Sequence, residues 1–337
     1  MRPSFHPRLV NGPFDDPGLF VPFAFQKRAL IFDLGDISNL PAGDLLKISH
    51  AFITHTHMDH FIGFDRLLRH VLGRAVNLAL FGPPGFLANI TARLGGYTWN
   101  LVDNFDYPLI LQVTEVHPDF TLYREFHCRD RFKPDRNALR RPFNGVLYEE
   151  PAFKVSAAIL DHKIPCLGLC VTERFHINII KDGLKKLGLA PGPWLTDFKQ
   201  VLYARTAPTA RFEVKRPDPK APEGFILGEL AEQIAKITPG QKFAYITDVI
   251  YSDANNEKIV ALARESDHLY IEAAFLEKDR AVAREKHHLT ARQAGELAAR
   301  ATAGQFSIFH FSPRYLGQER LLYREAAEAY KNYLSKV

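Results

Sequence analysis

Short apolar runs of strand length recur along most of the chain, and segments with helical periodicity separate them. We expect strands at residues 28–33, 51–55, 77–81, 153–160, 242–248, 268–272 and 306–311. Apolar spacings of three and four residues predict helices at 64–71, 255–265, 290–302 and 318–335. Because strands and helices alternate, the pattern favours an α/β layered architecture over an all-α or all-β one.

The composition is that of a folded, water-soluble protein. Of the 337 residues, 46% are hydrophobic and 24% charged, which argues against a disordered, collagen-like or coiled-coil chain. We treat residues 1–337 as a single domain that carries a basic, Pro-rich arm at about 199–224. A second basic stretch with aromatic residues, 123–143, lacks clean periodicity and is expected to form a long loop or the edge of a sheet.

Charge, apolar runs and cysteine count narrow the class of protein further. No run approaches the roughly 20 apolar residues of a membrane span, and the first residues lack the basic head and apolar run of a leader. The net charge of +5 permits a polyanionic partner without requiring one. Cys128, Cys166 and Cys170 are too few for a disulfide framework, so we expect ordinary buried thiols and a cytoplasmic location.

The segment THTHMDH concentrates four candidate metal ligands in six residues, at a predicted strand-to-helix turn: His55, His57, Asp59 and His60. Alternate residues of a strand share a face, so the first two imidazoles should converge. Such crowding is costly unless a metal takes the lone pairs, although a solvated turn capped by Asp59 is an alternative. Imidazole and carboxylate ligands without thiolate suit Zn, Mn or Fe in an open, catalytic site.

THTHMDH resembles the H-x-H-x-D-H signature of the metallo-β-lactamase fold, and several further segments resemble the ribonuclease Z family in order along the chain. These are IFDLGD at 31–36, LFGPPGF at 80–86, LDHKIPCLG at 160–168, LGLAPGPWL at 187–195, ITDV at 246–249 and HFSPRY at 310–315. The resemblance implies a four-layer αββα sandwich. It also implies a hydrolase that trims the 3′ trailers of precursor tRNA through metal-hydroxide attack on phosphorus.

The same resemblance implies two divalent metal ions, expected to be Zn, with Mn or Fe as alternatives. One would be held by His55, His57 and His162, and the other by Asp59, His60 and His310, with Asp248 bridging both. The residues leave plainer alternatives open, because His162 could end a strand, Asp248 could cap a turn and His310 could be a core histidine.

Hydrolysis of a phosphodiester also needs a proton for the leaving oxygen. IEAAF at 271–275 and HLT at 288–290 resemble the family's HEAT and HST motifs, which implies that Glu272 orients His288 as the general acid. Asp59 joins these two as a catalytic candidate. The sequence departs from the family pattern at four positions, namely Met58, Val249, Ile271 and Ala274.

The arm is where the chain differs most from the family, which carries a Gly-rich arm that grips tRNA. Here Pro, Arg and Lys predominate, and a solvated basic loop is the alternative to RNA binding. The candidate phosphate contacts are Lys199, Arg205, Arg211, Lys215, Arg216 and Arg314. The expected partner is RNA, with a homodimer implied by the resemblance. The rival functions are a phosphodiesterase for a small or cyclic-nucleotide diester and a non-catalytic metal- or nucleic-acid-binding module.

Overall fold

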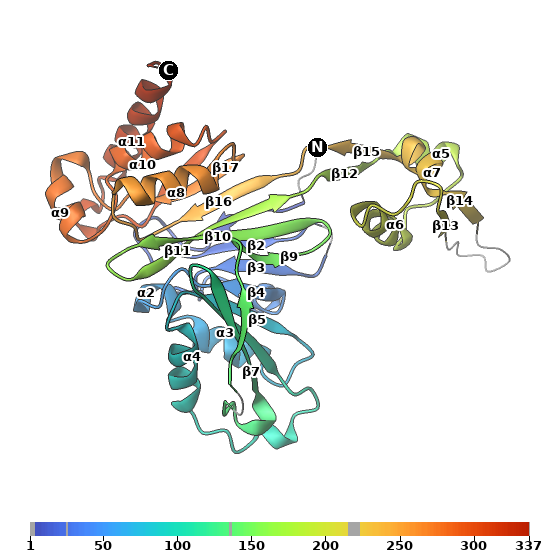
Figure 1. Cartoon of the computed structure of the whole chain (residues 1–337), viewed down its shortest axis with the longest axis horizontal. Helices are drawn as coiled ribbons and strands as arrows, with labels where there is room; N and C mark the ends of the chain where they lie inside the picture. The colour runs from blue at the N-terminus through green and yellow to red at the C-terminus, as the bar shows by residue number, and fades with distance from the viewer. Residues whose placement is uncertain (1–3, 25, 135–136, 215–222, 337) are drawn as a thin grey trace. The chain divides into compact units, whose positions relative to one another are not determined.

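The computed structural model describes residues 4–24, 26–134, 137–214 and 223–336 (Figure 1). Its contacts divide the chain into two compact units. The larger unit comprises Phe5–Leu147, Ser156–Cys170 and Lys242–Val337, and the smaller one comprises Met1–Ser4, Tyr148–Val155 and Val171–Gln241. A single folding domain over residues 1–337 stays a prediction, because compact units can still fold together.

An eight-stranded sheet in the order β1 to β8 forms the first half of the larger unit. Strands β3 to β6 run parallel to one another, and the strands at both ends of the sheet are antiparallel. The strands are β1 Arg8–Leu9, β2 Leu19–Pro22, β3 Ala29–Phe32, β4 Ile48–Phe52, β5 Leu78–Gly82, β6 Ile110–Val116, β7 Phe120–His127 and β8 Leu139–Pro142. The stretch 123–143 therefore supplies most of β7 and the edge strand β8, as expected.

A six-stranded sheet in the order β18-β17-β16-β11-β10-β9 forms the second half, and β16, β17 and β18 are parallel. These strands are β9 Val146–Glu149, β10 Phe153–Asp161, β11 Pro165–Glu173, β16 Lys242–Ile246, β17 His268–Glu272 and β18 Phe306–Phe309. Strands β9, β10 and β11 contribute residues to both units.

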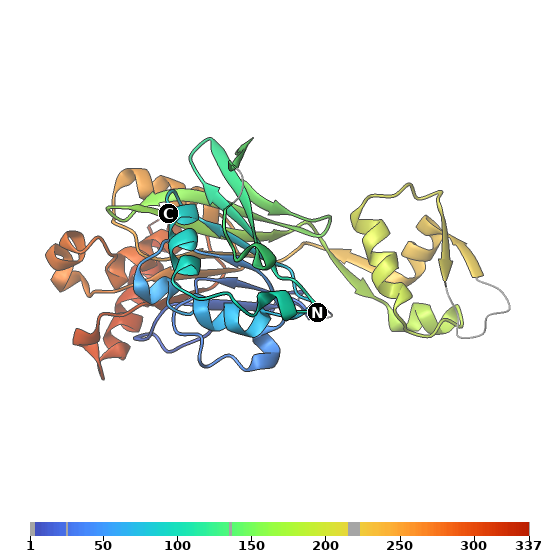
Figure 2. The same cartoon turned by 90° about the horizontal axis from the view of Figure 1, so that it is seen from below.

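Successive residues of a strand point in opposite directions, one toward the outer helices and the next toward the other sheet. In β3, Ile31 belongs to the core shared with the helices, whereas the ring of Phe32 lies 6.4 Å from that of Phe243 and 6.0 Å from that of Tyr245 in β16. Figure 1 shows the resulting layers, and in Figure 2 the blue and teal helices lie in front of the blue strands. The predicted αββα sandwich is confirmed.

Helices cover the outer face of each sheet in the larger unit. The first sheet carries α1 Ala42–Leu45, α2 Met58–Phe61, α3 Phe64–Val71 and α4 Phe86–Gly95. The second carries α8 Asp253–Ala263, α9 Arg280–Glu285, α10 Ala291–Arg300 and α11 Glu319–Leu334. Single 3₁₀ turns lie at Val102–Asn104, Cys128–Asp130, Glu277–Asp279 and Pro313–Tyr315. The four helices expected from periodicity are all present, with ends shifted by at most two residues.

The smaller unit has its own apolar core around Trp194, Phe198 and Leu230. Its elements are β12 His176–Ile179 paired with β15 Ala235–Thr238, β13 Arg211–Val214 paired with β14 Glu223–Ile226, and the helices α5 Lys181–Lys186, α6 Trp194–Tyr203 and α7 Leu227–Ile234. The arm expected at 199–224 falls within this unit, where its described residues form the end of α6, the strand β13 and the start of β14. Across the described parts of both units, no helix combines the length and apolarity needed to cross a bilayer.

Candidate metal centre and active site

The carboxyl ends of three parallel strands bring their candidate residues to one edge of the second sheet. Ile246, Ile271 and Ile308 are paired across β16, β17 and β18, so these strands end at the same level. Asp248 lies two residues beyond its paired isoleucine, and His310 follows β18 directly. Crevices at the carboxyl ends of strands are common ligand sites in α/β folds.

The THTHMDH turn approaches the same place from the first sheet, but not as part of a strand. We expected a strand at 51–55, whereas β4 ends at Phe52 and the following residues leave the sheet. Strand alternation therefore does not explain why His55 and His57 converge. Their rings lie 4.4 Å apart because the turn into α2 folds the second ring beside the first, with His55 buried and His57 exposed.

Asp248 lies at the centre of the cluster and divides the histidines between its two oxygens. Its Oδ2 lies 3.5 Å from His55 Nε2 and 3.4 Å from His162 Nε2. Its Oδ1 lies 3.4 Å from His60 Nε2 and 2.9 Å from His310 Nδ1. Potential ligand atoms within 4.8 Å of one another accordingly form one group with His55, His57, His162 and Asp248, another with Asp59, His60 and His310, and a third with Asp248, Glu272, His288 and His310.

Three of the inward-facing rings have a partner at their other nitrogen. His60 Nδ1 lies 2.9 Å from Asp33 Oδ2, and His162 Nδ1 lies 2.8 Å from the backbone oxygen of His287. His55 Nδ1 lies 3.2 Å from Thr54 Oγ1 and 3.8 Å from Cys166 Sγ. Such outer hydrogen bonds fix the tautomer and orientation of metal-binding imidazoles.

The charges in this cluster favour a cation. Burial lowers the pKa of both His60 and His310. Asp248 and Asp33 together still raise the pKa of His60 well above its usual value, and Asp248 and Asp59 together raise that of His310 to about 10. Burial, together with the neighbouring imidazole of His60, lowers the pKa of His55 to about 2. The same carboxylates would also stabilise a bound metal ion. The ion would then replace the protons, because an imidazole binds a metal only in its neutral form.

Buried nitrogens provide the test of whether these residues fit a metal. His55 Nε2, His60 Nε2 and His310 Nδ1 are buried and make no hydrogen bond of good geometry, although each lies 2.9 to 3.5 Å from an oxygen of Asp248. Buried polar atoms normally make well-aligned hydrogen bonds, so three nitrogens that surround one carboxylate without doing so need an explanation. A divalent ion accepted by imidazole and carboxylate ligands supplies it, and the residues therefore fit a metal centre.

Glu272 and His288 form a pair beside the metal candidates. His288 Nδ1 lies 2.9 Å from Glu272 Oε2, while Glu272 Oε1 accepts the backbone N–H of Val249 at 2.7 Å. Burial lowers the pKa of His288, but the charge and hydrogen bond of Glu272 outweigh burial and raise it. The ring of His288 lies 5.0 Å from that of His162 and 5.4 Å from that of His310, so this pair borders the cluster.

Four residues of the cluster or next to it have left-handed backbone conformations. Asp33, Asp248 and His310 have φ values of 58°, 45° and 61°, and His287 has 59°. Residues other than glycine seldom adopt this left-handed region, and tertiary contacts must hold them there. The strain turns each chain sharply at its strand end or loop, which brings the side chain or backbone oxygen to the cluster.

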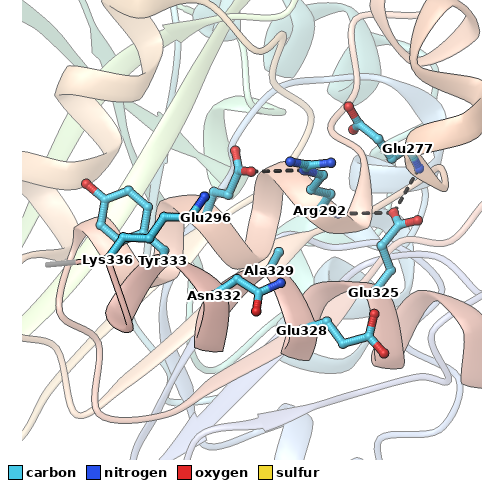
Figure 3. A pocket seen from close by; sticks show the side chains of 9 residues that line it. All are labelled: Glu277, Arg292, Glu296, Glu325, Glu328, Ala329, Asn332, Tyr333 and Lys336. Atoms are coloured by element: carbon cyan, nitrogen blue, oxygen red, sulfur yellow. Dashed lines mark hydrogen bonds and ion pairs between the residues drawn. The ribbon is translucent and has the colours of Figure 1, made fainter.

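A cavity away from the cluster, between α10 and α11, is unsuited to a polyanion. It measures about 330 Å³, and four glutamates outnumber the two cationic side chains, Arg292 and Lys336, among its lining residues. One of these glutamates, Glu325, accepts the backbone N–H groups of Glu277 and Arg292 (Figure 3). Carboxylate walls repel phosphates. The candidate active site is therefore the histidine and aspartate cluster.

Comparison with known proteins decides the family. Ribonuclease Z of Deinococcus radiodurans is 31% identical over 315 residues, which cover 91% of this chain and 90% of that relative. The chain belongs to the ribonuclease Z family. Ribonuclease Z of Trichodesmium erythraeum is 30% identical over 274 residues, covering 80% of this chain and 68% of the relative.

Comparison with solved structures shows the metallo-β-lactamase fold. The metallo-beta-lactamase fold protein YhfI from Bacillus subtilis matches with a TM-score of 0.55 and 14% identity, over 97% of this chain and 94% of that chain. No family model matches the chain. The resemblance to the ribonuclease Z family and the expectation of a hydrolase with the metallo-β-lactamase fold are confirmed.

The candidate substrate residues of this ribonuclease Z family member lie in different parts of the molecule. In the larger unit, Arg314 stacks 5.3 Å above the ring of Phe275, whose centre is 6.3 Å from that of His288. In the smaller unit Lys199 is partly buried, and Arg205 and Arg211 are exposed. Lys215 and Arg216 lie outside the described residues.

Asp33 is the main functional candidate that sequence reasoning missed. It is fully buried and accepts hydrogen bonds from the backbone N–H and hydroxyl of Thr54 and from the hydroxyl of Tyr245, besides facing His60. The signal was present in IFDLGD, since an aspartate that directly follows an apolar run has to find partners when it is buried.

The four departures from the family pattern leave the cluster intact. Met58 is 75% exposed between the candidate ligands His57 and Asp59, so it changes the rim of the candidate site. Val249 offers only its backbone N–H to Glu272, which any residue except proline can do. Ile271 and Ala274 are buried in the apolar core of the second sheet.

Proposed function

We propose that this chain is an endoribonuclease that uses two divalent metal ions to remove 3′ trailers from precursor tRNA. The division of the histidines between the two oxygens of Asp248 carries the proposal. A carboxylate with one oxygen toward each of two ligand sets suits a bridge between two ions. The names of the curated relatives support RNA as the substrate.

One ion would be held by His55, His57 and His162 and the other by Asp59, His60 and His310, with Asp248 shared. Two such ions lower the pKa of water and neutralise charge at phosphorus when bound. Imidazole and carboxylate ligands suit Zn, and Mn or Fe would also bind. The partly exposed carboxylate of Asp59 faces the open side of the cluster and could also orient the attacking water.

His288 is placed to supply the proton that the leaving oxygen needs. Glu272 occupies its Nδ1, so Nε2 is the atom that can donate. Water adds to phosphorus, the bond from phosphorus to the 3′-oxygen breaks, and His288 protonates that oxygen. The products expected are a 3′-hydroxyl on the tRNA and a 5′-phosphate on the trailer. Exposed Arg205, Arg211 and Arg314 would contact phosphates of the substrate.

Cleavage of a precursor tRNA tests the proposal. The metal-loaded chain should release a trailer with a 5′-phosphate, in a reaction that weakens steeply with salt, and Asp248→Ala should abolish it. Salt-insensitive hydrolysis of bis-p-nitrophenyl phosphate without tRNA cleavage would favour a small-diester phosphodiesterase instead. Bound metal without either activity would favour a binding module. The homodimer stays a prediction, which light scattering can test.

A further inference from the structure

A second cavity lies directly beside the proposed proton donor. It measures about 190 Å³ and is lined by Ile250, Tyr251, Arg280, Arg284, His288 and Gln293. All six residues belong to the larger unit. The metal ligands proposed above do not line it, so this cavity is distinct from the metal centre although His288 borders both.

The cavity carries positive charge and hydrogen-bond donors. Arg284 is exposed and, within the described parts of the chain, makes no ion pair; Arg280 is 61% exposed at its side chain and reaches Glu277 at only 3.4 Å. Gln293 is buried, and its Oε1 accepts the backbone N–H of Thr290, which leaves its amide N–H groups available. Two guanidinium groups beside a buried amide suit a phosphate.

The imidazole of His288 stands between this cavity and the metal ligands. On one side its ring lies 5.0 Å from the ring of His162, and on the other it lines the cavity. The oxygen that His288 protonates belongs to the strand that leaves, so the chain attached to that oxygen must continue past His288. The next phosphodiester of that strand would then meet Arg280 and Arg284.

We propose that this cavity binds the phosphodiester of the RNA that lies next to the cleaved one, on its 5′ side. The inference rests on the proposed function, because it takes its direction from the leaving 3′-oxygen. A free phosphate ion offers the same chemistry, but a phosphate tethered to the bound strand reaches the cavity at a far higher effective concentration. RNA is therefore the ligand that we assign.

A thermodynamic cycle, analogous to a double-mutant cycle, tests this assignment by combining one change in the substrate with one change in the protein. The phosphate on the 5′ side of the cleavage site is replaced by a neutral methylphosphonate, and the protein is tested as wild type and as Arg280→Gln with Arg284→Gln. Cleavage gives kcat/KM, and fluorescence anisotropy in EDTA gives the Kd of uncleaved RNA. The control is Arg320→Gln with Arg324→Gln, which removes two exposed charges from α11.

Either change alone should lower kcat/KM and RNA affinity by about 10- to 100-fold, and the two together should cost no more than either one. The control pair should change both quantities less than twofold. Additive losses, or a harmless methylphosphonate, overturn the inference. The inference is also overturned if inorganic phosphate competes with RNA for the wild-type protein while the losses from the methylphosphonate and from the arginine substitutions are additive. Coupling in binding without any cleavage would instead overturn the proposed function, and would show that the cavity holds this phosphate of an RNA that the protein binds and does not cut.

Discussion

Asp33 Oδ2 lies 2.9 Å from His60 Nδ1, and both side chains are fully buried. The same aspartate accepts the hydroxyl of Tyr245 from the opposite sheet. The carboxylate of Asp33 thus links the two sheets. It also orients the imidazole of His60, whose other nitrogen faces Asp248. Asp33 therefore makes the geometry of the candidate metal centre depend on how the two sheets pack together.

Asp33→Asn should lower metal affinity by about 10- to 100-fold, because His60 loses the charged partner that orients its ring. Competition with a coloured chelator measures the change. Asp36→Asn is the control, since Asp36 is exposed and contacts Ser38 instead. Unchanged affinity in Asp33→Asn, with the protein still folded by circular dichroism, would contradict this role.

Glu272→Gln should reduce kcat by about 10²- to 10³-fold on precursor tRNA with little change in KM. Glutamine still accepts the N–H of Val249 but no longer presents a negative charge to His288, so the loss should fall on the chemical step. Metal content measured by mass spectrometry should stay at the wild-type value. The exposed Glu285→Gln is the control, and a parallel rise in KM would point to a merely structural role.

Metal should stabilise the larger unit. Ions that bind only the folded chain add about 2.7 kcal/mol to the free energy of unfolding at a concentration 100 times Kd. Thermal unfolding with increasing Zn²⁺ or Mn²⁺ measures the shift, and a chelator should reverse it. Asp248→Ala should remove the response, whereas Asp106→Ala at an exposed site should keep it. A metal response that survives in Asp248→Ala would place the binding elsewhere.

His50 should make the protein sensitive to acid. Burial, with a smaller effect of Arg28, lowers the pKa of His50 to about 3. The unfolded chain binds this proton near pH 6.5, so stability present above pH 6.5 is lost as the pH falls toward 3. At pH 5 the loss is about 2 kcal/mol.

His50→Gln removes this titration. The difference in free energy of urea unfolding between pH 8 and pH 5 should therefore shrink by about 2 kcal/mol relative to wild type. His70→Gln, at the partly exposed end of α3, is the control and should keep the wild-type dependence. An unchanged pH dependence in His50→Gln would refute the prediction.

Gly295 allows α10 and α11 to approach closely. A Cβ built at this position would lie 2.1 Å from the backbone oxygen of Ala326 in α11. Gly295→Ala should therefore lower the free energy of unfolding by about 1–3 kcal/mol, although alanine normally favours a helix. Gly43→Ala in α1, where a Cβ would meet nothing within 4 Å, should be neutral or stabilising in the same urea titration.

Local pattern sufficed for the elements whose apolar face is regular. The helix expected at 64–71 and the strand expected at 268–272 have the bounds observed for α3 and β17. The strand expected at 51–55 fails at its carboxyl end, because His55 is buried by the cluster and not by the sheet. Periodicity shows which positions are buried, but it does not show whether the sheet or other tertiary partners bury a polar residue.

The candidate site divides in the same way. THTHMDH could be recognised because its candidate ligands are adjacent in sequence. The position of Asp33 after an apolar run shows that it needs partners but not that His60 is one of them, and nothing near His287 marks its backbone oxygen as the partner of His162. The cavity of Arg280 and Arg284 was equally invisible. Its residues come from three separate segments that meet only when α9 and the loop after β16 fold beside His288.

The sequence by itself determined the layered α/β fold, the family and the donor atoms available, because these follow from periodicity and from motifs of neighbouring residues. Only the tertiary structure decided that Asp248 turns one oxygen toward each set of histidines, and that two arginines gather behind His288. The physical reason is that such contacts join residues far apart in the chain. Strand register and left-handed backbone at strand ends, not local propensity, set the distances between them.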